Sequence, residues 1–170
     1  GKVDEIKKIC KKNKIYLIED TAWGLGGKYG KNFLGNIGDI GTYSFDHAKI
    51  ITTGEGGMLT FKNRKHFLNA KAWHDHGHEN NPKFNRWEDT RKSSGFNFRM
   101  NELQGALGLA QLRKLNLLKK SQRKNYQIIL HKLNKLKNIT LRFYQKKSYI
   151  TADALVFFVL SKKIALKCRK

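Results

Sequence analysis

Alternation between short apolar segments and amphipathic segments is the feature that most constrains the fold of this chain. Residues 15–18, 40–45 and 58–61 are apolar runs of strand length, whereas residues 3–12 have helical spacing and Asn63 can cap a helix that runs to about residue 75. Short strands that alternate with helices are typical of α/β proteins. Because the pattern starts within a helix and stops soon after a strand, we expect this chain to be a piece of a larger α/β protein.

The second half of the sequence has a different organisation. Apolar residues recur at helical spacing over residues 101–135, where we expect a long helix that contains a bend or break. Further strands are expected at residues 139–144 and 154–161. The polar segment at residues 77–94 contains the only proline, Pro82, and predicts a long loop, a kind of segment that often has a function.

Three side-chain types at the strand ends indicate ligand chemistry. Asp20 follows the first strand, and the carboxyl ends of strands are the usual ligand edge of an α/β sheet. Lys49 lies five residues after Ser44 and just before the glycine turn at residues 54–57. In a cleft, lost hydration disfavours a lysine's charged form, and a neutral lysine attacks aldehydes. A hydroxyl and glycine amides can bind phosphate. Each feature alone is more typical of a surface lysine, a capping aspartate or a plain turn.

Together, these features form an ordered set of motifs along residues 16–112. The set is Ile18-Glu19-Asp20, then Gly38-Asp39-Ile40 with Ser44-Phe45, Lys49 and Thr52-Thr53-Gly54-Glu55-Gly56-Gly57, then Gly95-Phe96-Asn97-Phe98-Arg99-Met100-Asn101-Glu102-Leu103-Gln104. In order and spacing, the set closely resembles the DegT-type (DegT/DnrJ/EryC/StrS) sugar aminotransferases, fold type I enzymes that use pyridoxal 5′-phosphate (PLP).

The resemblance implies a domain organisation. Residues 1–110 are expected to be the C-terminal part of the PLP-binding large domain, with a mixed, mostly parallel sheet. Residues 111–138 are expected to form a long connecting helix region. Residues 139–170 are expected to be the incomplete start of a small C-terminal α/β domain. We therefore expect this chain alone to be inactive or poorly folded.

The resemblance also implies roles for individual residues. Lys49 matches the catalytic lysine that forms the Schiff base with PLP, and Asp20 matches the acid that pairs with the pyridinium nitrogen. Ser44 matches a hydroxyl that contacts the PLP phosphate. Asn97 matches a residue that reaches the partner's cofactor across a homodimer with shared active sites. Trp23 is also expected to touch the cofactor, at a position where many relatives have His or Gln.

The substrate is less constrained than the cofactor. His76 and Arg99 are expected to shape the substrate pocket, although a structural role fits Arg99 equally well. His74, His76 and His78 alternate in a way that a metal site can use, but no other ligand group completes the set, so we assign no metal.

The resemblance implies transfer of an amino group, from glutamate as the expected donor, to a keto sugar for surface polysaccharide or lipopolysaccharide. The sugar is either nucleotide-linked or of the 8-amino-3,8-dideoxy-octulosonate type. A sugar dehydratase of the same family is one alternative, but that branch has histidine in place of the lysine, and Lys49 argues against it. A catalytically incomplete fragment with a binding or regulatory role is another.

Positive charge is concentrated at the C-terminal end, because residues 101–170 contain 17 Lys/Arg and two acids in a chain of formal charge +22. Such charge is compatible with an anionic partner such as nucleic acid. We interpret it as a solvated helix face and expect neither a nucleic-acid nor a membrane partner. Since no apolar run approaches the ~20 residues of a membrane helix, and Cys10 and Cys168 form no C-x-x-C pair, we expect a cytoplasmic protein.

Overall fold

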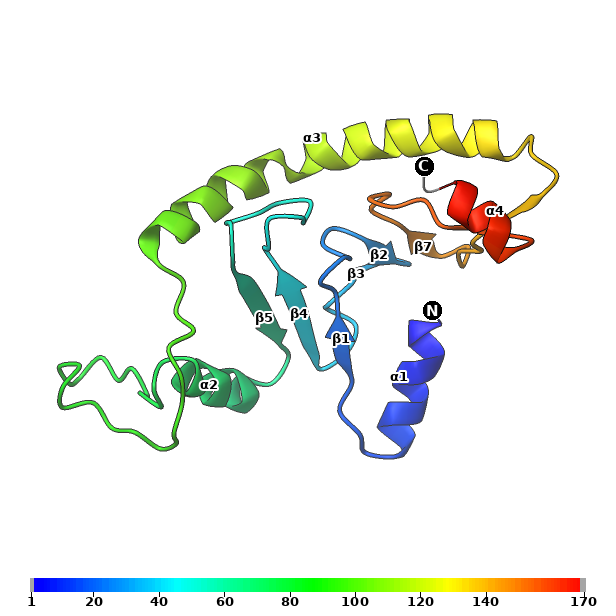
Figure 1. Ribbon diagram of the computed structural model, residues 1–170. Coiled ribbons are helices and arrows are strands. Elements are labelled where there is room, and N and C mark those ends of the chain that lie inside the picture. Colours follow the sequence, from blue (N-terminus) through cyan, green and yellow to red (C-terminus); the bar gives the residue numbers. More distant parts are fainter. Residues whose placement is uncertain (1, 169–170) are drawn as a thin grey trace.

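The computed structural model describes residues 2–168, which form four helices and eight strands in that range (Figure 1). In chain order they are α1 (Val3–Lys12), β1 (Ile18–Asp20), β2 (Lys28–Tyr29), β3 (Asn32–Phe33), β4 (Ile40–Ser44), β5 (Gly57–Phe61), α2 (Arg64–Trp73), α3 (Glu102–Leu133), β6 (Ile139–Leu141), β7 (Ser148–Tyr149), β8 (Phe157–Val159) and α4 (Lys162–Lys167). The α/β class expected from the sequence is confirmed.

The main sheet has the order β1-β4-β5. β1 pairs with β4 in parallel, with Asp20 opposite Thr42, and β4 pairs with β5 in antiparallel, with Ser44 opposite Gly57. Two smaller sheets, β3-β2-β7 and β6-β8, are antiparallel. In residues 2–168 only the β1–β4 pairing is parallel, so the prediction of a mostly parallel sheet is wrong for this chain. The link between β4 and β5 contains no helix that would carry the chain over the sheet, and it returns directly to the neighbouring position.

One face of the main sheet is closed by the loop between β3 and β4. Glu19 points into this loop and is buried, and its carboxylate accepts hydrogen bonds from the backbone N–H groups of Gly35 (3.0 Å), Ile37 (2.6 Å) and Gly38 (2.6 Å). The Tyr43 hydroxyl donates to the carbonyl of Leu34 at 2.9 Å. Because a Cβ on Gly35 would lie 2.1 Å from that hydroxyl, and its φ is +86°, only glycine fits there.

The opposite face of the sheet is open. Side chains of all three strands and of α2 line an apolar groove of about 1210 Å³, among them Ile18, Ile40, Leu59, Phe61, Leu68 and Trp73. Ile18 is 58% exposed and Leu59 is 50% exposed. The sheet therefore buries its polar loop-facing side better than its apolar side.

The two longer helices of the middle region start as the sequence predicts. Asn63 caps α2 by accepting a hydrogen bond from the Lys65 backbone, which confirms the expected cap. Asn101 and Gln104 form a reciprocal capping box at the start of α3. The expected break is absent, because α3 continues from Glu102 to Leu133, and the expected bend is present as a gradual curve of the helix axis (Figure 1). Its sequence contains no proline, the most common cause of a sharp kink.

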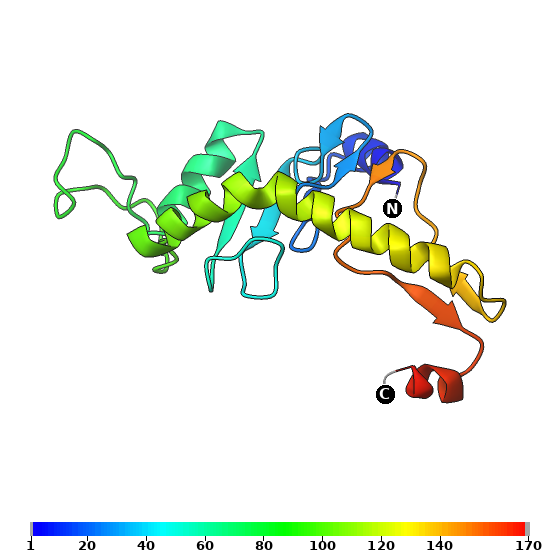
Figure 2. The same ribbon diagram turned by 90° about the horizontal axis from the view of Figure 1, so that it is seen from above.

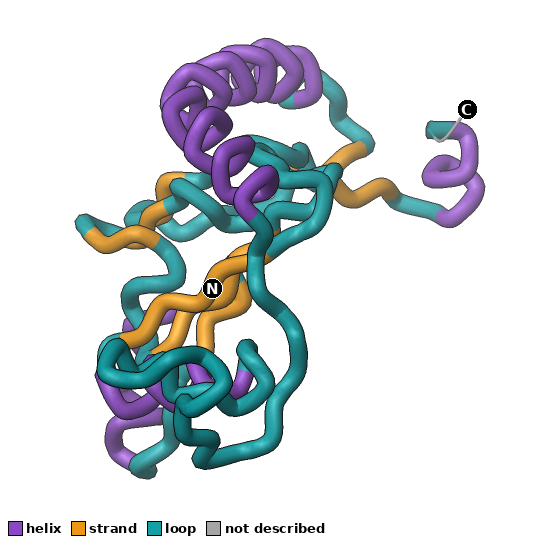
Figure 3. Tube along the Cα trace, turned by 90° about the vertical axis from the view of Figure 1, so that its left-hand side faces the viewer, coloured by secondary structure: helices purple, strands orange, loops and turns teal. Residues whose placement is uncertain are grey.

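Helix α3 connects distant parts of the molecule. It begins beside the long loop that follows α2, passes the strands, and ends at β6 (Figures 1 and 2). The tube view shows α3 along one side, with α4 and its preceding strand set apart from the main sheet (Figure 3). None of the described helices combines the length and apolarity needed to cross a bilayer.

Candidate functional site

Lys49 lies beside Trp23 at the carboxyl end of the main sheet. A small cavity of about 10 Å³ there is lined by Ala22, Trp23, Leu25, Ser44, Lys49, Ile50, Thr151 and Asp153. The Lys49 Nζ atom is 3.6 Å from the centroid of the Trp23 ring. Trp23 follows β1, whereas Ser44 is the last residue of β4. Because these two strands are parallel neighbours, their carboxyl ends meet at one edge and bring the two side chains together.

Asp20 is the last residue of β1 and is exposed. One of its carboxylate oxygens accepts a hydrogen bond from the Ala22 backbone N–H at 3.0 Å. It does not line the cavity at Lys49. Three of the sequence-predicted residues, Trp23, Ser44 and Lys49, therefore share one cavity in the described part of the chain, and Asp20 lies just outside it.

The loop between β4 and β5, residues 45–56, holds the backbone of Lys49 in place. Phe45 donates to the Gly56 carbonyl at 2.8 Å and accepts from the Thr53 backbone at 2.9 Å, which closes the loop at its base. Gly54 has a φ of +81°, a conformation that favours glycine. From α3, the Gln104 amide donates to the Glu55 carbonyl at 2.9 Å. The glycine motif and the start of α3, which are distant in sequence, thus support one turn.

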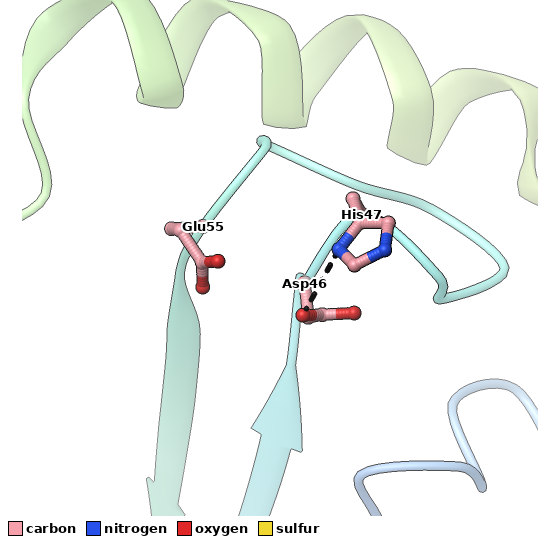
Figure 4. A group of neighbouring side chains, drawn as sticks. All are labelled: Asp46, His47 and Glu55. Atoms are coloured by element: carbon pink, nitrogen blue, oxygen red, sulfur yellow. Dashed lines mark ion pairs between the residues drawn. The ribbon is translucent and has the colours of Figure 1, made fainter.

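Asp46, His47 and Glu55 stand close together on this loop (Figure 4). One ligand atom from each lies within 4.8 Å of the others. His47 and Glu55 are exposed, and the Asp46 carboxylate already accepts the Ala48 backbone N–H at 2.8 Å and contacts the His47 Nδ1 at 3.3 Å. The Ala48 hydrogen bond, followed by the contact with His47 and the charge of Lys49, lowers the pKa of Asp46, whereas burial opposes the shift. These contacts account for the cluster as part of the turn, and we assign no metal to it.

The other predicted site residues lie on the segment of residues 74–99, which we call the arm. Its two sides pair at an isolated bridge between Asp75 and Asn97, and the His76 backbone N–H donates to the Phe96 carbonyl at 3.0 Å. Arg99 Nε donates to the Asn97 side chain at 3.0 Å. His76, Asn97 and Arg99 are therefore neighbours, but none of them lines the cavity at Lys49.

A buried carboxylate fastens the base of the arm. Asp75 is 3% exposed and accepts two hydrogen bonds from the Arg86 guanidinium, at 2.9 and 2.7 Å, while Arg99 Nε lies 3.3 Å away. The hydrogen bonds from Arg86 hold the pKa of Asp75 well below its ordinary value, and the charges of Arg86, Arg99 and His78 act in the same direction against burial. Arg99 thus has a structural contact here.

A second buried pair stands farther along the arm. His78 Nδ1 lies 3.3 Å from Asp89, and both side chains are 4% exposed. Burial raises the pKa of Asp89, but backbone hydrogen bonds from Asn81 and Asn80 and the contact with His78 outweigh it, so that the pKa is lowered. His78 Nδ1 thus lies beside a carboxylate, and in residues 2–168 no group of three potential metal ligands close to one another includes the histidines of the arm.

Several important residues were not predicted from the sequence. Thr151 and Asp153 come from a segment more than 100 residues after Lys49, yet both line its cavity. Asp153 is one of only two acids in residues 101–170, and this was the one available signal. Glu19 and Asp75 anchor loops through burial, and nothing in their local sequence distinguishes them from exposed acids.

Comparison with known proteins gives one family. The model of the DegT/DnrJ/EryC1/StrS aminotransferase family matches residues 1–169. A GDP-perosamine synthase of Caulobacter vibrioides is 38% identical over 114 residues, which are 67% of this chain and 29% of that protein.

Solved structures agree over almost the whole chain. Helicobacter pylori PseC, an aminotransferase involved in the biosynthesis of pseudoaminic acid, superposes with a TM-score of 0.88 and 27% identity, covering 99% of this chain and 44% of PseC. An E. coli GDP-4-keto-6-deoxy-D-mannose-3-dehydratase with bound hydrated PLP superposes with a TM-score of 0.83 and 26% identity, covering 95% of this chain and 44% of the dehydratase. The chain thus spans less than half the length of these relatives.

Proposed function

Because this chain belongs to the DegT/DnrJ/EryC1/StrS aminotransferase family, we propose that Lys49 binds PLP covalently in an enzyme that transfers an amino group to a keto sugar. One observation carries the proposal: the only cavity-lining lysine at the carboxyl edge of the described sheet is Lys49, and it lies with Ser44 and Trp23. Ser44 and Lys49 match positions that the family motifs assign to the cofactor, whereas Trp23 stands where many relatives have His or Gln.

The chemistry of the donor set fits PLP. Lys49 supplies an amine for the aldehyde carbon, and Ser44 supplies a hydroxyl for the phosphate. Asp20 stands at the end of β1 next to this cavity, and in residues 2–168 only one of its two oxygens accepts a hydrogen bond. The second oxygen is therefore available for a ring N–H. When bound, PLP supplies an electron sink that stabilises negative charge on the substrate carbon.

The residues of the chain then have separate tasks. Lys49 Nζ would hold the cofactor and would be the group that moves a proton at the substrate carbon. Asp20 keeps the ring nitrogen protonated by pairing its carboxylate with that N–H. Trp23 contacts Lys49 and would lie beside the cofactor.

The substrate proposal follows the relatives. Glutamate is the proposed amino donor, and the acceptor is a keto sugar, either nucleotide-linked, as the name of the GDP-perosamine synthase suggests, or of the 8-amino-3,8-dideoxy-octulosonate type. His76 and Arg99 are proposed substrate contacts. The dehydratase among the similar structures gives the second candidate, a sugar dehydratase, and Lys49 favours transfer over dehydration.

A homodimer with shared active sites is part of the proposal. Asn97 lies on the arm and does not line the cavity of its own chain, which is compatible with a contact to the cofactor of a partner subunit. The proposed domain division is residues 1–110, 111–138 and 139–170. Its support is that α3 leads away from the main sheet to the separate β6-β8 pair (Figure 2).

Borohydride trapping with PLP, followed by peptide mapping of the full-length protein, tests the proposal. We expect a pyridoxyl adduct at Lys49 that disappears completely in Lys49→Ala. Lys28→Ala is the matched control, because Lys28 also lies over an aromatic ring, that of Phe33 at 4.3 Å, but outside the cavity, and this variant should keep the adduct. A wild-type protein without an adduct at Lys49 contradicts the proposed function.

A further inference from the structure

Helix α3 is held against the molecule by one of its sides. Lys119 and Tyr126 are its buried residues, and Arg123 donates to the Ile150 carbonyl at 2.9 Å and lies 4.0 Å from the centroid of the Tyr149 ring. Because the three helix residues are four and three positions apart, they share one face of α3. The opposite face is therefore turned outward, and no described segment lies in front of α3 when the molecule is seen from above (Figure 2).

The outward face of α3 combines basic and aliphatic side chains. Exposed residues three or four positions apart run along it and form what we call the outer stripe: Arg113, Leu117, Lys120, Lys124, Ile128 and His131. Leu117 is 68% exposed and Ile128 is 49% exposed. Two large aliphatic side chains thus stand in solvent between cations, although nothing in the described chain covers them.

No acid neutralises the outer stripe. The sequence contains no Asp or Glu between Glu102 and Asp153, and none of the ion pairs in residues 2–168 includes a residue of α3. The sequence alone favours a solvated helix face for this charge. The structure adds that part of the charge lies in one stripe with exposed aliphatic side chains, which is the composition of a helix that lies on a membrane surface.

We propose that the outer stripe binds the surface of an anionic phospholipid bilayer, with the helix axis parallel to that surface. The side chains of Arg113, Lys120 and Lys124 pair with the headgroup phosphates, and Leu117 and Ile128 insert between the headgroups. The stripe is about 27 Å long at the ~1.5 Å rise per residue of an α-helix, so it spans several headgroups. The proposal is independent of the proposed function, because no residue of the stripe lines the cavity at Lys49.

The composition of the stripe favours lipid over nucleic acid, the other large polyanion that attracts such charge. Binding of single-stranded nucleic acid adds stacking of bases on aromatic rings, but Tyr126, the only Phe, Tyr or Trp on α3, is 9% exposed. Exposed aliphatic side chains between the cations find no partner on a phosphate backbone. In a bilayer they find one at the boundary of the acyl chains.

Co-sedimentation of the full-length protein with vesicles tests the charged part of the stripe. We expect binding to vesicles of equal parts phosphatidylcholine and phosphatidylglycerol, no binding to phosphatidylcholine alone, and release at high salt, which screens surface charge. Lys120→Gln with Lys124→Gln should weaken binding by roughly 10- to 30-fold, as expected for two cations near an anionic surface. Lys8→Gln with Lys12→Gln is the matched control, because it changes two exposed lysines at the same spacing on α1, far from α3 (Figure 1).

A second variant tests the aliphatic part. Leu117→Ser with Ile128→Ser should weaken vesicle binding by roughly 10-fold or more, because two apolar side chains are lost from the bilayer, and should leave any binding to duplex DNA unchanged. Wild-type protein that does not bind the anionic vesicles overturns the proposal. Equal vesicle binding by wild type and the serine variant overturns it too, since charge alone then accounts for the binding. Tighter binding to duplex DNA than to the vesicles assigns the stripe to nucleic acid and overturns the choice of lipid.

Discussion

Two buried carboxylates, Glu19 in the main sheet and Asp75 at the base of the arm, hold their surroundings by different means. Glu19 accepts three backbone N–H groups from Gly35, Ile37 and Gly38. Asp75 accepts its hydrogen bonds from the side chain of Arg86, and Arg99 is close by. The first anchor joins side chain to main chain, whereas the second joins side chain to side chain.

This difference affects how firmly the loop at Glu19 and the arm are held. Backbone N–H groups carry no ionic charge and are present whatever the residue, so the loop at Glu19 depends on one side chain only. The arm depends on a carboxylate and on guanidinium groups that are 39% and 43% exposed, which water and salt screen. We infer that the loop between β3 and β4 is held firmly at Glu19, and that salt and acid loosen the arm more easily.

The largest expected effect is that of Glu19→Ala. Three buried N–H groups lose their acceptor, and each unsatisfied group costs about 1 to 3 kcal/mol, so the free energy of unfolding should fall by at least about 3 kcal/mol. Urea denaturation of the full-length protein measures it. Glu88→Ala changes an exposed glutamate and should stay within about 0.5 kcal/mol of wild type. A comparably small loss in Glu19→Ala would show that the sheet loop has another anchor.

Asp75→Asn should have a smaller and more local effect. Loss of the charge-assisted hydrogen bonds to Arg86 costs about 1.5 to 3 kcal/mol, so hydrogen exchange should accelerate about 10- to 100-fold in the arm and little in β1 or β4. Mass spectrometry of the exchanged peptides gives both values. Lys92→Gln breaks an exposed ion pair with Glu79 and is the control, with an effect below about 1 kcal/mol. Equal acceleration of exchange in the arm and in the sheet would show that the two regions unfold together.

Acid should produce the smallest of the three changes, in the arm. The folded-state pKa of Asp75 is below its ordinary value of 3.8, and that of Asp89 is lowered as well. Both groups therefore stabilise the arm fully above that value, and their contribution is lost as the pH falls through the lower folded pKa. Hydrogen exchange, corrected for its intrinsic pH dependence, should rise in the arm below about pH 4. In Asp75→Asn the acid-induced rise in hydrogen exchange of the arm should be weaker than in wild type. An identical rise would show that other groups cause it.

Much of the local structure was predictable from the sequence. The helix at residues 3–12, the Asn63 cap and the strands at β4 and β5 are confirmed, because spacing and capping are local properties. The two-residue strands β2, β3 and β7 were not predicted, since so short a segment has no periodicity and forms only when a partner strand lies beside it. The prediction of a mostly parallel sheet was wrong because strand direction depends on the route that the chain takes between strands, which local sequence does not show.

The candidate site shows the same limit. Lys49, Ser44 and Trp23 were predicted from motifs, and the structure places them in one cavity. The wall formed by Thr151 and Asp153 was not predicted, because its distance along the chain from Lys49 contains no local signal and only α3 and β7 bring it back. Contacts between segments so far apart along the chain are decided by the folded structure and not by local sequence.

The sequence by itself determined the family, the α/β class and the residues proposed for the cofactor, because these rest on motifs of fixed spacing. Only the tertiary structure decided the fates of the neighbouring acids Glu19 and Asp20. Successive side chains of a strand point to opposite faces, so Glu19 enters the closed loop of backbone N–H groups, and Asp20 remains exposed at the strand end. Two adjacent carboxylates of similar chemistry thus become a structural anchor and a candidate cofactor ligand, because one strand turns them to different surroundings.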